Sequence, residues 1–319
     1  MSRIHVLSEN TFIRGLRCVV ILLAAMFLLP TSGANAQQTF KTPDEAATAL
    51  VGAVKTGDRK AILSVLGPDG IDIVSSGDEV ADAATRSKFV AAYDAKHSIA
   101  KEGDDKAIMV VGQEDFPVPI PLVRAKGNWH FDTAAGREEI LARRIGKDEL
   151  DAIQSCLAYV DAQNEYAEKD RTGAGANVYA QRVVSQPGKK DGLYWPTAQG
   201  EDPSPLGELV AEATVRGYRV GAGRTPYNGY YFKVLTKQGV AAPGGELEYI
   251  VHGKMIGGFA LVAYPAEYRN SGVMTFIVSH TGTVYQKDLG PATSKLADRM
   301  TVYNPDKSWQ KVSDTTPVK

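Results

Sequence analysis

Apolar residues recur at intervals of three and four in the first part of the chain, which predicts amphipathic helices. Residues 42–45, Thr-Pro-Asp-Glu, form a capping box with proline at the first helical position. Gly57 ends this helix, Asp58 caps a second one, and Gly67 followed by proline stops it. A longer helix is predicted to begin at Asp78, so the chain opens with a helical hairpin and a third helix.

The period then shortens from that of a helix to that of a strand. Three short segments rich in β-branched or aliphatic side chains, separated by turns that contain glycine, are predicted strands: Lys106–Val111, Val118–Arg124 and Trp129–Phe131. Helices followed by an antiparallel meander are typical of an α+β domain in which helices cover one face of the sheet. We assign this domain to residues 37–145.

Helical spacing returns after residue 134 and is interrupted near Gly146, which predicts two helical pieces. A polar, glycine-rich stretch at Lys169–Asn177 predicts a loop. Residues 146–178 are therefore expected to connect two domains.

The second half, residues 179–319, has the alternation and turn signals of a mostly antiparallel β-rich domain with peripheral helices. Helices are expected at about residues 204–215 and 292–300. The predicted strands are Tyr230–Leu235, Glu246–Val251, Phe259–Tyr264, Val273–Ser279 and Thr283–Lys287. The fold class expected for the whole chain is α+β.

The first 36 residues have the three-part layout of a secretory signal. Three arginines precede an apolar run of 12 residues, Cys18–Leu29, and Ala34-Asn35-Ala36 supplies a cleavage site. The run is too short for a membrane-spanning helix, which needs about 20 apolar residues. We expect cleavage after Ala36, a periplasmic or secreted protein, and no membrane insertion after cleavage.

Charge and cysteine content narrow the partners and the chemistry. The chain has 36 basic and 37 acidic side chains, so it lacks the excess of positive charge that is typical of nucleic-acid-binding proteins. Cys18 would leave with the signal, so Cys156 has no partner for an intrachain disulfide. A buried, inert thiol is the expected state of Cys156, with a reactive thiol as the alternative.

Six segments along the chain are distinctive: Leu66–Asp78, Asp191–Pro196, Tyr227–Leu235, Gly257–Tyr268, Ser271–Val278 and Val284–Gly290. Together they are similar to the exported bacterial family catalogued as domain of unknown function 2950. The resemblance covers nearly all of the chain after the signal. It implies a location in the cell envelope and supplies no activity and no catalytic residues.

Two further resemblances concern parts of the chain. The capped hairpin and meander, up to about Arg137, resemble the cone-shaped folds of the nuclear-transport-factor-2-like superfamily, whose members hold small molecules in a pocket or use the same surface for pairing. The strand pattern after Tyr230 resembles the globular tails of pilin-like proteins, but the N-terminal assembly helix of pilins is absent from the sequence.

Motifs for common chemistry are missing from the sequence. The histidines after the signal, His97, His130, His252 and His280, form no H-x-x-x-H or H-E-x-x-H pair, so no metal site is predicted. No G-x-S-x-G elbow and no nucleotide-binding cradle occurs, so neither catalytic residues nor a cofactor is predicted.

Tyrosines and charged residues gather instead at the predicted strand ends of the second half. If these ends meet, they form an aromatic cleft suited to sugars, peptides or glycan strands. The alternative is that the tyrosines, which favour strands, only cap the core. The candidate ligand-binding residues are Tyr227, Tyr230, Tyr231, His252, Lys254, Tyr264, Glu267, Tyr268, Arg269 and His280.

These patterns favour a non-catalytic envelope protein that binds a small ligand or an envelope component through its second half. One alternative is an envelope hydrolase acting on glycan or peptide, for which Glu248 and Glu267 would be the carboxylate pair. Another is a pilin-like or envelope assembly factor that pairs exposed strand edges.

Overall fold

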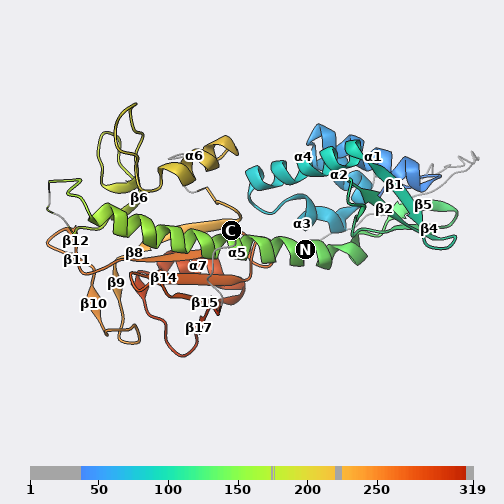
Figure 1. Ribbon diagram of the computed structural model, residues 1–319. Coiled ribbons are helices and arrows are strands. Elements are labelled where there is room, and N and C mark those ends of the chain that lie inside the picture. Colours follow the sequence, from blue (N-terminus) through green and yellow to red (C-terminus); the bar gives the residue numbers. More distant parts are fainter. Residues whose placement is uncertain (1–36, 174, 176, 220–224, 314–319) are drawn as a thin grey trace, which may run out of the picture. The chain divides into compact units, whose positions relative to one another are not determined.

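The computed structural model describes residues 37–173, 175, 177–219 and 225–313 (Figure 1). The predicted signal peptide lies outside the described residues. The fold is mixed α+β with several antiparallel sheets, as the sequence predicts at this level.

The helices of the first part begin where the capping residues predict. The Thr42 hydroxyl accepts a hydrogen bond from the Glu45 amide at 3.1 Å, and the Asp78 carboxyl accepts from the amides of Val80 and Ala81. These helical segments are α1 (Pro43–Thr56), α2 (Arg59–Leu66), η1 (Pro68–Gly70), α3 (Ile71–Val74) and α4 (Glu79–Ala95).

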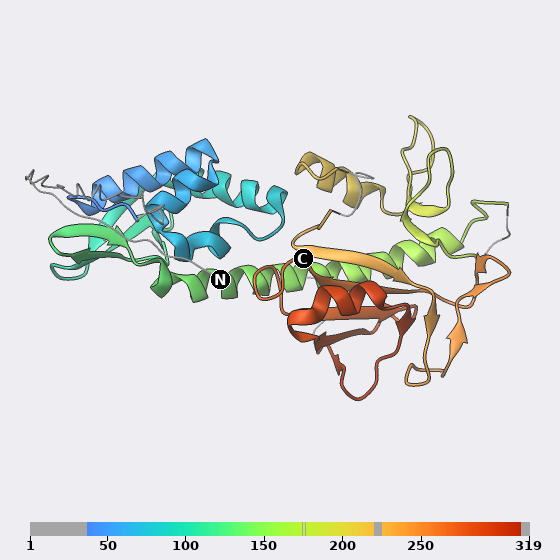
Figure 2. The same cartoon turned by 180° about the vertical axis from the view of Figure 1, so that it is seen from behind.

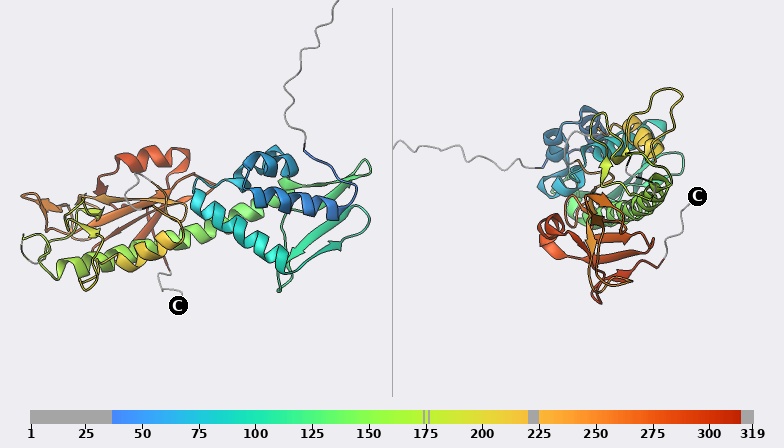
Figure 3. Two further views of the ribbon diagram at one scale, coloured as in Figure 1. Left: turned by 90° about the horizontal axis from the view of Figure 1, so that it is seen from above. Right: turned by 90° about the vertical axis from the view of Figure 1, so that its left-hand side faces the viewer.

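An antiparallel sheet with the order β1-β2-β4-β5 packs against these helices (Figure 3). Its strands are β1 (His97–Lys101), β2 (Lys106–Val111), β3 (Phe116–Pro117), which pairs with β2, β4 (Leu122–Ala125) and β5 (Asn128–Phe131). Strand β1 was not predicted from the sequence. This edge strand is mostly exposed and polar, so it lacks the apolar alternation of a half-buried strand.

Helix α5 (Thr133–Ala167) is continuous over 35 residues, so the predicted break at Gly146 is wrong. Gly146 faces open space, and a single glycine in a helix interior costs only about 1 kcal/mol relative to alanine. The predicted connector therefore begins inside a helix. Cys156, on the same helix, is fully buried, which confirms the expected burial of its thiol.

The main sheet of the second part has the order β17-β15-β14-β13-β8 and is antiparallel throughout. Helix α5 packs behind it and α7 (Thr293–Arg299) lies in front (Figure 2). The strands are β8 (Tyr230–Leu235), β13 (Ala260–Pro265), β14 (Met274–Ser279), β15 (Val284–Asp288) and β17 (Gln310–Lys311).

Short elements surround this sheet, and two of their pairings are parallel, β6 with β7 and β9 with β16. Two or three residues per strand give too little periodicity to predict such pairs. These elements are β6 (Arg182–Val184), β7 (Gly192–Tyr194), α6 (Gly207–Val215), β9 (Lys237–Gln238), β10 (Leu247–Glu248), β11 (Ile250–Val251), β12 (Lys254–Met255), η2 (Gly290–Ala292) and β16 (Val302–Tyr303).

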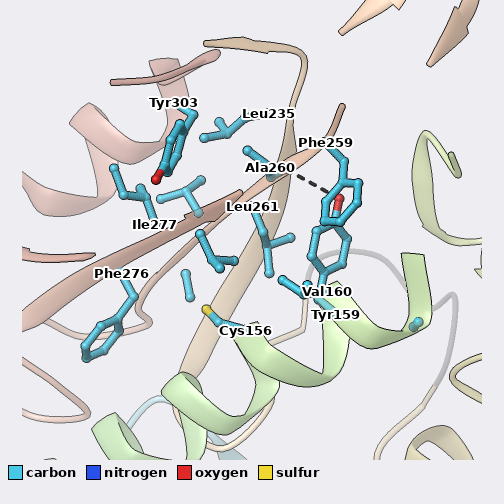
Figure 4. Packing of buried hydrophobic residues seen from close by; sticks show 14 of the residues in the cluster. Cys156, Tyr159, Val160, Leu235, Phe259, Ala260, Leu261, Phe276, Ile277 and Tyr303 are labelled. Atoms are coloured by element: carbon cyan, nitrogen blue, oxygen red, sulfur yellow. Dashed lines mark hydrogen bonds between the residues drawn. The ribbon is translucent and has the colours of Figure 1, made fainter. Parts of the chain in front are cut away.

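The larger core forms where α5 meets the main sheet (Figure 4). Cys156 and Val160 of α5 pack with Leu261 and Ile277 of the central strands, and all four are buried. The Tyr159 hydroxyl donates to the Ala260 carbonyl at 3.4 Å. In the part of the chain that the structure describes, no helix combines the length and apolar character needed to cross a membrane.

Candidate functional site

The tyrosines expected to form a cleft lie on opposite faces of the main sheet. Tyr230 is fully buried and donates its hydroxyl to the Met274 carbonyl at 3.0 Å. Tyr231 and Tyr264 lie on the other face, with ring centroids 5.7 Å apart. The Tyr264 hydroxyl donates to Asp298 at 2.8 Å. Because neighbouring strand residues point to opposite faces, Tyr230 and Tyr231 cannot line one concavity.

Three of the other candidates lie in turns or short strands away from those tyrosines. His252 occupies an exposed left-handed position with φ 51° between β11 and β12, and Lys254 is exposed on β12. His280 is exposed beside Phe259, with ring centroids 6.1 Å apart.

The remaining candidates follow β13. Glu267 accepts a hydrogen bond from the Asn270 side chain at 2.7 Å. The Tyr268 hydroxyl donates to Asp288 at 3.1 Å, and the Arg269 guanidinium lies over the Tyr268 ring. Glu248, the other half of the carboxylate pair considered above, lies on β10 next to Lys237.

The feature best suited to hold a ligand is a groove between α5, α6 and β8, named here the α6 groove. Its volume is about 250 Å³ and its walls are mostly apolar. Among the lining residues that the structure describes, Arg219 alone carries a charge. The lining consists of Ser155, Tyr159, Val183, Val184, Leu206, Leu209, Val210, Ala213, Tyr218, Arg219, Thr225, Pro226, Tyr227, Phe232 and Leu261.

Of the ten candidate residues, Tyr227 alone belongs to this lining. Its ring packs edge-on against Tyr218, with centroids 5.0 Å apart. The Arg216 guanidinium lies over both rings, at 5.6 and 5.7 Å from their centroids, and donates to the Asn228 side chain at 2.6 Å. One wall of the groove is thus an aromatic pair held by a cation–π contact.

A buried carboxyl group fixes this wall. The Tyr218 hydroxyl donates to Asp78 at 2.9 Å, and the Gly229 amide donates to the same oxygen at 3.0 Å. The Asn228 amide in turn donates to the Tyr218 hydroxyl at 3.2 Å. Burial raises the pKa of Tyr218, so its phenol stays a proton donor at neutral pH. Asp78 therefore joins the start of α4 to the groove wall.

A second buried carboxyl group, Asp148 of α5, lies behind the Asn228-Gly229 turn. Burial raises its pKa to about 7, an effect that Lys147 partly offsets and Asp151 reinforces. Gly229 has φ +75°, and a Cβ there would lie 2.6 Å from the Asp148 carboxyl. Glycine is thus required at this position both for its backbone conformation and for its lack of a side chain.

Asp78 was predicted from the sequence only as the start of a helix, and Tyr218, Asp148 and Phe232 carried no local signal of a site. The contact between Asp78 and Tyr218 spans 140 residues, so no local pattern could have shown it. Within the described ranges no group of three or more His, Cys, Asp or Glu side chains is arranged to hold a metal ion.

Neither the curated proteins nor the solved structures contain a significant match to this chain. One family model does match, that of the family described as "Protein of unknown function (DUF2950)", and the match extends over residues 37–312. Because it covers most of the sequence, the chain belongs to the DUF2950 family.

Proposed function

We propose that this chain is an exported, non-catalytic binding protein of the cell envelope whose α6 groove holds the apolar part of a ligand or partner. The observation that carries the proposal is the lining of the groove, which is mostly apolar, comes from several elements and, among the residues that the structure describes, includes one charged side chain, Arg219. Small-molecule sites commonly combine mostly apolar walls with a few polar groups that orient the ligand.

One wall of the groove is fixed by contacts among its own residues and with Asp78. Tyr218 is hydrogen-bonded to Asp78, Tyr227 packs against Tyr218, and Arg216 contacts both rings. A site with walls fixed in advance loses less conformational entropy on binding than one that must be ordered. These contacts support a role of the groove in binding.

Export is part of the proposal and rests on the signal-like pattern of residues 1–36. We also propose that the domains follow the sequence-based ranges, 37–145, 146–178 and 179–319, with a nuclear-transport-factor-2-like first domain. The capped helices packed on an antiparallel sheet support that relationship.

A fluorescence titration with dansyl-labelled undecanoic acid, which joins an apolar chain to a carboxylate, tests the groove. Ala213→Phe would fill the groove, because Ala213 is a lining residue of α6. We expect it to raise the dissociation constant at least about tenfold. Ala211→Phe adds the same ring at an exposed position of α6 and should bind like the parent protein.

Circular dichroism and thermal unfolding would establish that both variants fold. Equal binding by the two folded variants, or the absence of saturable binding by the parent protein, would refute the proposed function.

A further inference from the structure

Strand β8 is one of the two edge strands of the main sheet, and its register shows which of its main-chain groups face outward. The Tyr230 amide donates to the Tyr227 carbonyl at 3.1 Å, and the Tyr227 amide donates to the Tyr230 carbonyl at 2.8 Å. Both bonds lie on the side of β8 that faces away from β13. On the β13 side, Tyr230 lies opposite Pro265, a residue without an amide proton. Hydrogen-bonding direction alternates along a strand, so Phe232, Val234 and Thr236 also face outward.

The two ends of this outer edge are paired. The main chain of Tyr230 bonds with that of Tyr227. The Thr236 amide donates to the Thr301 carbonyl at 3.2 Å, and the Thr236 carbonyl accepts from the Tyr249 amide at 3.0 Å. Between them, the main-chain amides and carbonyls of Phe232 and Val234 have no hydrogen-bond partner among the residues that the structure describes. An unpaired edge of this kind is a template for an added strand.

The open edge adjoins the α6 groove, because the Phe232 side chain lines the groove. Residues directly opposite one another on paired strands point to the same face of the sheet. A strand added beside Phe232 would therefore direct alternate side chains toward the groove, where they would meet Leu209 and Val210 of α6.

Charge complementarity narrows the occupant further. Arg219 is the one charged residue of the described lining, and Arg216 is exposed beside the aromatic wall. A ligand that fits both the open edge and the groove is an extended peptide with an apolar side chain and an acidic side chain on the same face.

We propose that β8 and the α6 groove together recognise an extended peptide segment of a partner protein, which adds to the sheet through Phe232 and Val234. An apolar side chain of the peptide enters the groove and an acidic side chain pairs with Arg219. This assignment rests on the proposed binding function and names the class of ligand. Strand addition draws affinity from main-chain bonds and specificity from the pockets for alternate side chains.

The test uses fluorescein-labelled peptides of the alternating sequence Thr-Leu-Thr-Leu-Thr-Asp-Thr, with Val or Phe replacing Leu in two further probes. Each peptide is made in two forms. One form is N-methylated at the two apolar residues and the aspartate, and the other is N-methylated at the threonines. Only one edge of an added strand faces β8, so one methylation pattern should weaken binding at least about tenfold more than the other. Equal weakening by both patterns would overturn strand addition.

A protein variant gives a second readout. Val234→Pro removes the amide proton of residue 234, which points away from β13. The hydrogen bonds between β8 and β13 are made by the residues on either side of Val234, so they remain. We expect Val234→Pro to bind the peptides at least about tenfold more weakly than Val234→Ala. Equal peptide binding by these two variants, once both are shown to fold, would contradict the assignment.

The dansyl fatty acid separates the two proposals. If it binds in the groove and none of the peptides does, the peptide assignment fails and the groove stands. If neither binds, both proposals fail. If the protein instead self-associates through β8, with dimer formation abolished by Val234→Pro, the occupant is a second copy and the peptide assignment is overturned.

Discussion

The carboxyl group of Asp78 caps helix α4 through one oxygen and, through the other, accepts a hydrogen bond from the hydroxyl of Tyr218, 140 residues further along the chain. The oxygen that bonds to Tyr218 also accepts a hydrogen bond from the amide of Gly229. Asp78 is 1% exposed and Tyr218 is 7% exposed, so both lie out of reach of bulk water. A wall of the α6 groove therefore depends on the same residue that starts a helix of the first part.

The first prediction concerns this junction. Asp78→Ala removes the acceptor of four donors, two of them in the helix cap, and should lower the free energy of unfolding by about 3 kcal/mol. Tyr218→Phe removes one donor and should cost about 1 kcal/mol. Urea denaturation followed by circular dichroism measures both changes.

Asp58→Ala is the matched control, because Asp58 caps α2 through the Lys60 amide alone. It should cost about 1 kcal/mol. An Asp78→Ala variant no less stable than Asp58→Ala would show that the contacts to Tyr218 and Gly229 contribute little.

The second prediction follows from the raised pKa of Asp148. The folded-state pKa of Asp148 is about 7 and the ordinary pKa of an aspartate is 3.8, so the folded protein holds up to one more proton than the unfolded chain between these pH values. The free energy of unfolding is therefore higher at low pH and falls as the pH rises through 7. Between about pH 5 and about pH 8, we expect it to fall by about 2 kcal/mol because of Asp148. Asp148→Asn should lose less stability over this interval.

Urea unfolding at both pH values measures the difference. Asp161→Asn, an exposed position on the same helix, should follow the parent protein. If Asp148→Asn and the parent protein lose equal stability, Asp148 does not titrate in this range.

The third prediction compares two glycines. Gly229→Ala places a methyl group against Asp148 at a left-handed position and should destabilise the fold by about 3 kcal/mol. Gly146→Ala lies in open space within α5 and should stabilise it by about 0.5–1 kcal/mol. Thermal unfolding of both variants reports the sign, and a shift of both in the same direction would contradict the geometry.

The fourth prediction concerns Cys156. Its side chain is fully buried, and burial raises the pKa of its thiol to about 12. The folded protein beginning at Gln37, which lacks Cys18, should therefore not react with Ellman's reagent, whereas the same protein unfolded in urea should release about one equivalent. Rapid reaction of the folded protein would mean that α5 opens away from the main sheet.

Local signals were enough to predict most of the regular elements. Thr42, Asp58 and Asp78 start helices as predicted, because a cap is a contact within a few residues. Strand β8 has the predicted limits, since its alternation and the turn before it are visible in the sequence. Gly146 is the exception, because the stability of a long packed helix outweighs the preference of one residue.

The candidate site was harder to predict. The run Tyr227 to Tyr231 looks like one aromatic cluster in the sequence, yet Tyr227 lines the groove, Tyr230 lies in the core and Tyr231 lies on the opposite face. The walls of the groove come from α5, α6, β8 and β13, which are far apart in sequence, so only the fold brings them together.

The central claim, that the α6 groove is the binding site, is tested most directly by hydrogen–deuterium exchange with and without dansyl-labelled undecanoic acid. If the claim is right, we expect slower exchange in α6 and in β8, and no change in the hairpin of β11 and β12. Protection of that hairpin without protection of α6 and β8 would contradict it.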